Sequence, residues 1–571
     1  MCSKRKRIFD DISNAVDESD SDVVEMSDNS DSDSESSYSS SVNISELEEC
    51  GQGDNLSKSD TSAPIGSREW SNEKGNKIIT KIPFHSNVGV NPVALLTHNF
   101  PPNPTKLDCF RLVFDHDLWQ SICTETNDYA TECIAVKPNS NWFPTTCDEI
   151  QAYFTLCVMM AQAKKHSIRS YWSGKGMTRT PGIREVMSLK RFLDISRYLH
   201  FQNNNALNKH DRLCKIAPVL DYFRKKFPEL NFPGENLSLD ESLMKFRGRL
   251  CFVQYNPSKR ARFGIKIYEL CDSKTGYCFS FSIYTGKTEG KQATLASEAI
   301  VMKLMEPYQG VGHTLFVDNW YSSPKLFEEL HNHGTNAVGT VRHNRKNMPK
   351  DTEFKQKLHR GESMIRYSES MSVVKWMDKK PVLVLSTCNS EIDYAMTKKV
   401  DMKTKMAVMK PRVVINYNTW MGGVDKQDQQ LASFPIMRRY VKGYRKVFFY
   451  VMNMALYNTY LLWMSVTGKK AKYSAFRIDV MEELMASLTL PHYQRRGRRS
   501  AGDTPMRLQA AHWAHFPRFI PANPGKQNPS RRCVVCSAHN KRSETRWECK
   551  RCVVALHVPE CFEIYHTKTN Y

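Results

Sequence analysis

The chain has 571 residues, 81 Lys and Arg against 60 Asp and Glu, a net charge of +21, and 17 cysteines. This length exceeds one hydrophobic core and predicts two to four domains. The N-terminus lacks the apolar core of a secretory signal, so we expect the protein to meet a reducing compartment, in which the cysteines stay unpaired.

The charges are separated along the chain. The first 50 residues contain 14 acidic and four basic residues, which leaves 77 basic and 46 acidic residues in the remainder. Such an excess of positive charge favours a polyanionic partner, and we expect nucleic acid rather than a membrane surface.

Residues 1–96 are rich in Ser, Asp and Glu over much of their length. We expect this region to be disordered, because it offers little apolar surface to bury. The run Lys4 to Arg7 is a candidate nuclear localisation signal, so the predicted location is the nucleus.

Helical periodicity begins near residue 97. In residues 147–165 apolar side chains recur at intervals of three and four, as an amphipathic helix requires. A second helix is predicted over 188–201, with Ser188 as its N-cap. The Pro and Gly break at 232–234 indicates a boundary near residue 235.

The pattern then changes to that of strands. Residues 277–284 alternate between apolar and polar side chains and follow a turn at 272–276, which predicts a hairpin with 266–270. Further elements are an apolar strand over 313–318, a helix from Ser323–Pro324 to Gly334, and a strand over 336–341. A mixed α/β sheet is the expected result.

Residues 344–410 are polar and Lys-rich with short strand-like pieces such as 381–387, which indicates an inserted lobe. Helices return from Met421. Residues 448–466 are nearly apolar over about the length of a membrane span. Because Asn and Thr side chains interrupt this run and a basic run precedes it, we predict a buried helix.

Three aspartates have contexts that predict convergence. Asp240 lies in a short alternating stretch, Asp318 ends the most apolar strand, and Asp425 begins a helical run with Asp428 one turn away on the same face. Two neighbouring strands and a crossing helix could bring the carboxylates together. Ordinary roles as caps, turn residues or solvated helix positions remain open, since spacing alone does not decide.

Clustered aspartates suit phosphodiester cleavage. Two divalent ions about 4 Å apart activate the attacking oxygen and stabilise the leaving oxygen in such enzymes. Carboxylates are the expected ligands because Mg²⁺ prefers oxygen donors.

The C-terminal segment has the paired spacing of a zinc site. Its seven candidate ligands are Cys533, Cys536, Cys549, Cys552, His557, Cys561 and His566. Two tetrahedral sites need eight ligands, so His539 or a water would complete them, whereas a ribbon with one Zn²⁺ would need only the two Cys pairs. A ubiquitin-ligase-like interaction module has similar spacing.

Basic clusters elsewhere are candidate phosphate contacts, and solvated helix faces are the alternative. They are Lys259, Arg260 and Arg262; Arg342, Arg345 and Lys346; and Arg438, Arg439, Lys442, Arg445 and Lys446.

Three blocks, 239–243, 316–321 and 421–428, resemble in order and spacing the catalytic blocks of piggyBac-like transposases and their domesticated vertebrate relatives. The resemblance extends from about residue 97 to the C-terminus. It implies Asp240, Asp318 and Asp425 as a catalytic triad holding two Mg²⁺, with Asp428 as a further acidic contributor.

The resemblance also implies the architecture: an α/β fold with an RNase H-like mixed-sheet core and an insertion lobe, flanked by a helical dimerisation and DNA-binding domain and a small C-terminal Cys/His zinc domain. The expected parts are a disordered region 1–96, helical domain 97–235 and 433–500, catalytic core 236–343 and 411–432, insertion lobe 344–410, linker 501–530 and zinc domain 531–571.

The implied reaction is cut-and-paste transposition of double-stranded DNA at TTAA sites, through nicking, hairpin formation on the transposon ends and strand transfer, by a homodimer or larger synaptic complex. One or two Zn²⁺ in a cross-brace tail would help bind the transposon ends. The alternative is a domesticated DNA-binding protein that no longer transposes.

Overall fold

The computed structural model describes residues 68–491, with gaps at 74–78, 140–141, 175–178, 209, 249, 258–261, 287–294, 389–392, 401–406 and 437–441, and residues 515–571. The chain divides into two units, one of residues 1–165 and 190–491 and the other of residues 166–189 and 492–571. The acidic run and Lys4 to Arg7 lie outside the described residues.

A nine-stranded mixed sheet forms the centre of the first unit. Strand β3 (Asn236–Lys245) pairs antiparallel with β5 (Phe263–Asp272) and parallel with β7 (Thr314–Val317), which pairs parallel with β8 (Asn336–Thr340). Strands β4 (Gln254–Tyr255) and β6 (Cys278–Ile283) both pair with β5. The predicted hairpin of 266–270 with 277–284 and the strands predicted over 313–318 and 336–341 are confirmed.

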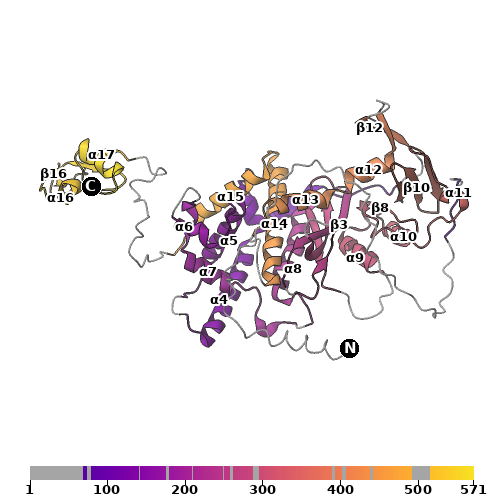
Figure 1. Cartoon of the computed structure of the whole chain (residues 1–571), viewed down its shortest axis with the longest axis horizontal. Helices are drawn as coiled ribbons and strands as arrows, with labels where there is room; N and C mark the ends of the chain where they lie inside the picture. The colour runs from indigo at the N-terminus through magenta and orange to yellow at the C-terminus, as the bar shows by residue number, and fades with distance from the viewer. Residues whose placement is uncertain are drawn as a thin grey trace. The chain divides into compact units, whose positions relative to one another are not determined.

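The insertion lobe extends the same sheet. From β8 the order continues antiparallel through β11 (Pro381–Ser386), β10 (Ser372–Met377) and β9 (Ser363–Tyr367). A separate hairpin is formed by β12 (Tyr394–Val400) and β13 (Ala407–Pro411). Figure 1 shows these strands at the end of the unit that lies away from the helical part.

The helical part is built from segments far apart in sequence. Figure 1 shows α14 (Gly443–Thr467) and α15 (Tyr473–Ser487), in orange, among the purple helices, and both contact α3 (Lys106–Val113). The other helices of this part are α2 (Pro92–Thr97), α4 (His116–Val136), α5 (Cys147–Gln162), α7 (Leu189–Tyr198) and α8 (Ala217–Leu230). Helices from before residue 235 and after residue 443 therefore pack together, and the dimerisation and DNA-binding roles that the resemblance implies for them stay predictions.

Local signals explain several helix starts. The side chains of Thr105 and Asp108 form a reciprocal capping box on α3, and Thr146 accepts a hydrogen bond at the start of α5. In α10 (Pro324–Asn332), Ser323 caps the first turn, and Gly334 beyond its end has φ of 70°. The predicted start and stop of this helix are confirmed.

Shorter helices link these elements. They are α9 (Ala296–Met305), α11 (Thr352–Lys355), α12 (Arg412–Trp420) and α13 (Gly423–Ser433), with 3₁₀ turns at Asn204–Ala206, Cys214–Ile216 and Glu306–Tyr308. A small sheet pairs β1 (Gly89–Val90) with β2 (Asn231–Phe232).

Helix α14 is buried along most of its length, as predicted for residues 448–466. Among the described helices, none is both long and apolar enough to cross a membrane. The prediction that Arg445 and Lys446 contact DNA is wrong, because both side chains are buried. Arg445 instead donates hydrogen bonds to the carbonyls of Ser196 and Arg197 at the end of α7.

Part of the region expected to be disordered has a defined structure. Ser71 forms two backbone hydrogen bonds with Tyr367 at the free edge of β9, and Arg68 pairs with Glu328. The described residues from 79 to 96 include β1 and most of α2. The folded part of the chain therefore begins before residue 97. Backbone pairing with strands from elsewhere in the chain orders this segment, although its composition predicted disorder.

The second unit contains short elements. They are a 3₁₀ turn (Arg169–Trp172), α6 (Pro181–Val186), β14 (Pro517–Phe519), β15 (Arg531–Arg532), α16 (Val534–Ala538), β16 (Glu544–Thr545), β17 (Trp547–Cys549) and α17 (Glu560–Thr567). Strands β14 and β17 pair, as do β15 and β16. Because β14 lies in the expected linker 501–530, the C-terminal fold includes residues before 531.

Candidate functional site

Asp240 and Asp318 lie side by side on the central sheet. Leu239 of β3 is paired with Val317 of β7, and each aspartate is the next residue. Parallel strands in register point equivalent side chains to the same face. Asp240 lies within β3, so the alternative of a helix cap at this position is excluded.

The surroundings of Asp318 disfavour its charge. Burial raises the pKa of this carboxyl, and the charge of Glu241 raises it further, while hydrogen bonds from the backbone of Trp320 and Tyr321 lower it. The Trp320 amide donates to Asp318 Oδ1 over 2.8 Å. A bound cation would favour the charged form that burial disfavours.

Helix α13 brings a third aspartate to this face. A Cβ built on Gly423 would lie 2.2 Å from Ser238 Oγ, so the start of α13 packs directly on β3, two residues before Asp240. Asp425 is exposed in the first turn of α13, where the helix dipole favours an anion. Asp428 follows one turn later.

The charges of all three aspartates act on the phenol of Tyr417 in α12. Burial raises the pKa of its phenol, and the negative charges of Asp318, Asp240 and Asp425 raise it further. All three carboxylates therefore lie near this side chain, whose hydroxyl is 3.4 Å from Thr340 Oγ1.

Sequence reasoning missed Glu269, which lies opposite Asp240 on β5. The side chain is fully buried, and burial together with the charge of Asp428 raises the pKa of its carboxyl well above the usual range. Its oxygens accept hydrogen bonds from Gln427 Nε2 at 2.7 Å and from the Tyr450 hydroxyl at 3.2 Å. The one sign in the sequence is that Glu269 is an acidic residue within the strand predicted over 266–270.

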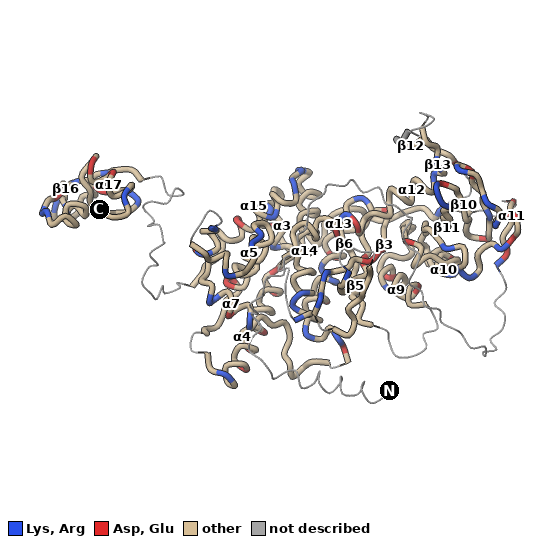
Figure 2. The backbone as a smooth tube through the Cα atoms, in the orientation of Figure 1, with Lys and Arg blue, Asp and Glu red and all other residues tan. Residues whose placement is uncertain are grey.

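Basic side chains lie close to the acidic face. Lys266 Nζ is 3.5 Å from Glu241 Oε1, and its charge lowers the pKa of Asp318. Arg345 donates to the carbonyl of Asn319 over 3.0 Å, and Arg342 is exposed beside it. Figure 2 shows Lys and Arg on both units. Of the other basic clusters, 258–261 and 437–441 lie outside the described residues.

The carboxylate oxygens of the aspartates do not form a compact group of ligand atoms. Within the described part of the chain, two groups of Cys, His, Asp or Glu have ligand atoms all within 4.8 Å of one another, and neither contains an aspartate. Like charges repel at short distance, which disfavours contact between carboxylates when no cation is bound. Carboxylates on two strands and a helix nevertheless have the donor chemistry for Mg²⁺.

Both of those groups lie in the C-terminal unit. One contains Cys533, Cys536, His557 and Cys561, and the other contains His515, Cys549, Cys552 and His566. All seven predicted ligands are included, and their alternation along the chain is that of a cross-brace. Four Cys and His side chains at this spacing fit a tetrahedral metal site.

The eighth position belongs to His515, which lies in the predicted linker 501–530 and not among the predicted ligands. Its Nδ1 lies 3.4 Å from Cys549 Sγ and 3.3 Å from Cys552 Sγ. His539, the predicted alternative, has its Nδ1 2.9 Å from the Val535 carbonyl oxygen and belongs to neither group. A lone His 34 residues before Cys549 gives no spacing signal, and only the β14–β17 pairing brings it close.

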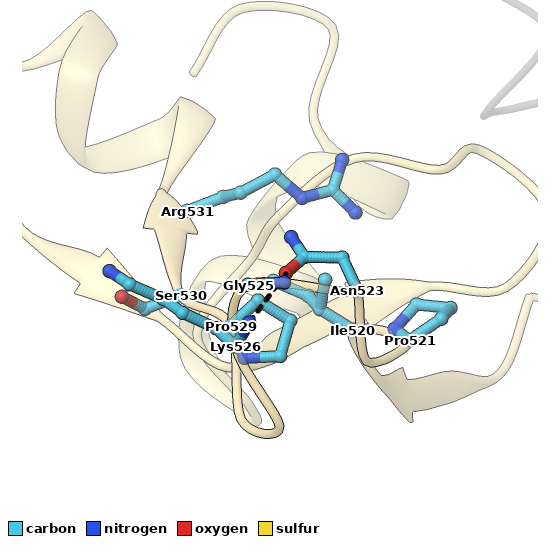
Figure 3. A pocket seen from close by; sticks show the side chains of 8 residues that line it. All are labelled: Ile520, Pro521, Asn523, Gly525, Lys526, Pro529, Ser530 and Arg531. Carbon is cyan, nitrogen blue, oxygen red and sulfur yellow. Dashed lines mark hydrogen bonds between the residues drawn. The ribbon is translucent and has the colours of Figure 1, made fainter.

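An open pocket beside β15 does not belong to either site. Figure 3 shows its lining, in which the Lys526 amide donates to Asn523 Oδ1 over 2.8 Å. None of its lining residues is an acid, Cys or His.

The fold and a match to a known family identify the class of this protein. The strand order β6-β5-β3-β7-β8, antiparallel and then parallel, with carboxylates at its middle strands, defines an α/β protein with the predicted RNase H-like core. Residues 105–460 match the family described as transposase IS4. The chain belongs to this family, in its piggyBac-like branch.

Its relatives include two human proteins. The chain is 28% identical to PiggyBac transposable element-derived protein 2 over 62% of its own length and 60% of that protein. It is 24% identical to PiggyBac transposable element-derived protein 3 over 82% of its length and 78% of that protein. The chain thus spans about three fifths of the first of these relatives.

The fold is shared with a solved structure. A piggyBac transposase, determined by cryo-EM in a synaptic complex with hairpin DNA, superposes with a TM-score of 0.62 at 24% identity, covering 82% of this chain and 97% of the other.

Proposed function

We propose that the chain is a piggyBac-type DNA transposase that cuts and joins double-stranded DNA at the acidic face of β3, β7 and α13. The observation that carries the proposal is the placement of Asp240 and Asp318 in register on parallel strands, with Asp425 delivered by a helix packed on the same face. Family membership supports the reaction class.

In this proposal Asp240, Asp318 and Asp425 hold Mg²⁺, and Asp428 adds negative charge one turn from Asp425. When bound, two such ions activate the attacking oxygen and stabilise the leaving oxygen of a phosphodiester. The chain itself orients the carboxylates and offers Arg342 and Arg345 to the DNA backbone.

We further propose that the two Cys/His groups each hold Zn²⁺ and that this tail contacts transposon ends. Six Lys and Arg residues around the groups suit phosphate contacts: Arg531, Arg532, Lys541, Arg542, Lys550 and Arg551. A synaptic dimer acting on TTAA sites in the nucleus completes the proposal, and the related synaptic complex with hairpin DNA supports the partner.

An excision assay tests this function. The wild type, Asp318→Ala and the exposed-surface control Asp221→Ala would act on a reporter flanked by element ends from the source genome. Excision that restores TTAA in the wild type and control but not in Asp318→Ala is the expected result.

A second candidate function is a DNA-binding protein derived from a transposase. The names of the human relatives, which describe them as derived from transposable elements, favour it. No excision by the wild type from matched ends, together with retained DNA binding, would select this alternative.

A further inference from the structure

Glu269, Gln427 and Tyr450 form a hydrogen-bonded group behind the aspartates. Glu269 lies on β5, Gln427 on α13 and Tyr450 on α14, so the group joins three elements. Glu269 and Gln427 are fully buried. Burying polar side chains costs folding free energy, which hydrogen bonds between them offset. Such a network also fixes the relative positions of the elements that it joins.

The group connects the two halves of the acidic face. Glu269 is the cross-strand partner of Asp240, and its Oε2 accepts from Gln427, which lies between Asp425 and Asp428 in sequence. The Tyr450 hydroxyl lies 3.2 Å from Glu269 Oε1 and 3.3 Å from Asp428 Oδ1. Glu269 therefore links the strand next to Asp240 with the helix that carries Asp425 and Asp428.

Helix α13 packs on β3, β5 and α14, and buries Val424 and Leu431. The Gly423 contact with Ser238 fixes its start, and Lys426 donates to the Ser273 carbonyl over 2.6 Å. Gln427 is the polar side chain that α13 buries, so its hydrogen bond to Glu269 adds a directional contact at the second turn, next to Asp428. A rotation there would swing Asp425 and Asp428 relative to Asp240.

We propose that Glu269 is a positioning residue of the acidic site, which acts through Gln427 and Tyr450 to fix the orientation of α13 and hence the spacing of Asp425 and Asp428 from Asp240. This inference rests on the proposed function, in which the aspartates hold divalent ions. Partners that orient metal ligands typically change metal affinity by about 10- to 100-fold when they are removed.

The test measures metal binding directly in the full-length protein, by the electron paramagnetic resonance signal of free Mn²⁺, and separately the Mg²⁺ dependence of DNA cleavage. Tyr450→Phe removes one hydroxyl, and Glu269→Met removes both hydrogen bonds of the carboxyl. Glu269→Gln keeps a side chain of the same shape that can bond to both neighbours. Tyr460→Phe is the matched control, because its hydroxyl on the same helix donates to the Ala471 carbonyl instead.

We expect Tyr450→Phe and Glu269→Met to weaken Mn²⁺ binding at the aspartates by about 10- to 100-fold. The half-saturating Mg²⁺ concentration for cleavage should rise by the same factor, while the rate at saturating Mg²⁺ changes much less. Glu269→Gln and Tyr460→Phe should behave like the wild type. A purely structural defect would lower the saturated rate without this shift.

Wild-type Mn²⁺ binding in both Tyr450→Phe and Glu269→Met would overturn the inference. An equal loss of Mn²⁺ binding in Glu269→Gln and Glu269→Met would also overturn it, because the charge of Glu269 rather than its hydrogen bonds would then matter. If Glu269→Met does not fold, Tyr450→Phe decides. If Asp318→Asn binds as much Mn²⁺ as the wild type, the proposed function itself fails, and the inference fails with it.

Discussion

Asp240 and Asp318 are neighbours across two parallel strands, each one residue beyond the paired Leu239 and Val317. The two carboxylates thus lie on one face of the sheet, close to where β7 ends. Burial and the charge of Glu241 disfavour the ionised form of Asp318, and a bound cation would offset this cost.

That cost gives a prediction for Asp318→Asn. Because burial raises the pKa of Asp318 in the folded protein, the folded state holds its proton more tightly than the unfolded state. Without divalent ions the wild type should therefore lose stability as pH rises above the ordinary carboxyl range, and the Asn variant should lose less. Urea unfolding of both proteins between pH 4 and 8 measures the difference, and identical pH profiles would contradict the assigned environment.

The approach of α13 to β3 predicts different effects of substitution at two adjacent glycines. A Cβ at Gly423 would lie 2.2 Å from Ser238 Oγ and 2.8 Å from the Asp272 carbonyl oxygen, whereas one at Gly422 meets nothing within 4 Å. Gly423→Ala should displace the helix, lower stability by about 1–3 kcal/mol as overpacking does, and reduce cleavage more than tenfold.

Gly422→Ala is its matched control and should retain stability and cleavage close to the wild type. Both properties would be measured on the same preparations by thermal unfolding and by nicking of a short duplex. Equal behaviour of the two variants would show that α13 does not pack on β3 as described.

The Cys/His groups predict zinc stoichiometry. The purified wild type should contain two Zn²⁺ per chain, and His515→Ala should contain one, because three remaining ligands bind more weakly. His539→Ala should keep two, since His539 belongs to neither group. Elemental analysis after dialysis counts the metal, and the reverse pattern would return the eighth position to His539.

His200 predicts acid sensitivity of the helical part. Its ring stacks on Tyr129 with centroids 4.2 Å apart, and burial, followed by the charges of Lys215 and Arg445, lowers its pKa to about 4. The unfolded state therefore takes up a proton first as pH falls below the usual value of about 6.5, and stability on the order of 3 kcal/mol is lost between there and pH 4.

His200→Phe retains the stacked ring without the titration, so its unfolding free energy should fall less between pH 7 and pH 4.5. The exposed His210, replaced in the same way, serves as the control and should keep the wild-type slope. Equal slopes in all three proteins would place the acid sensitivity elsewhere.

Local features were predictable because their signals are local. Alternation marked the β5–β6 hairpin, Ser323 and Gly334 marked the ends of α10, and paired cysteines marked the tail. Order and spacing of the three aspartate blocks indicated the family, which the match over residues 105–460 bears out. The roles of the individual aspartates remain a proposal.

The sequence by itself determined the helices and strands and the residue types at their ends, because periodicity and turn chemistry act over a few residues. The tertiary structure decided which distant side chains meet. Pairing of β14 with β17 brings His515 to Cys549, and the fold of α7 against α14 removes Arg445 from the surface. Burial of Glu269 beneath α13 likewise depends on contacts between residues more than 150 positions apart, for which no local pattern exists.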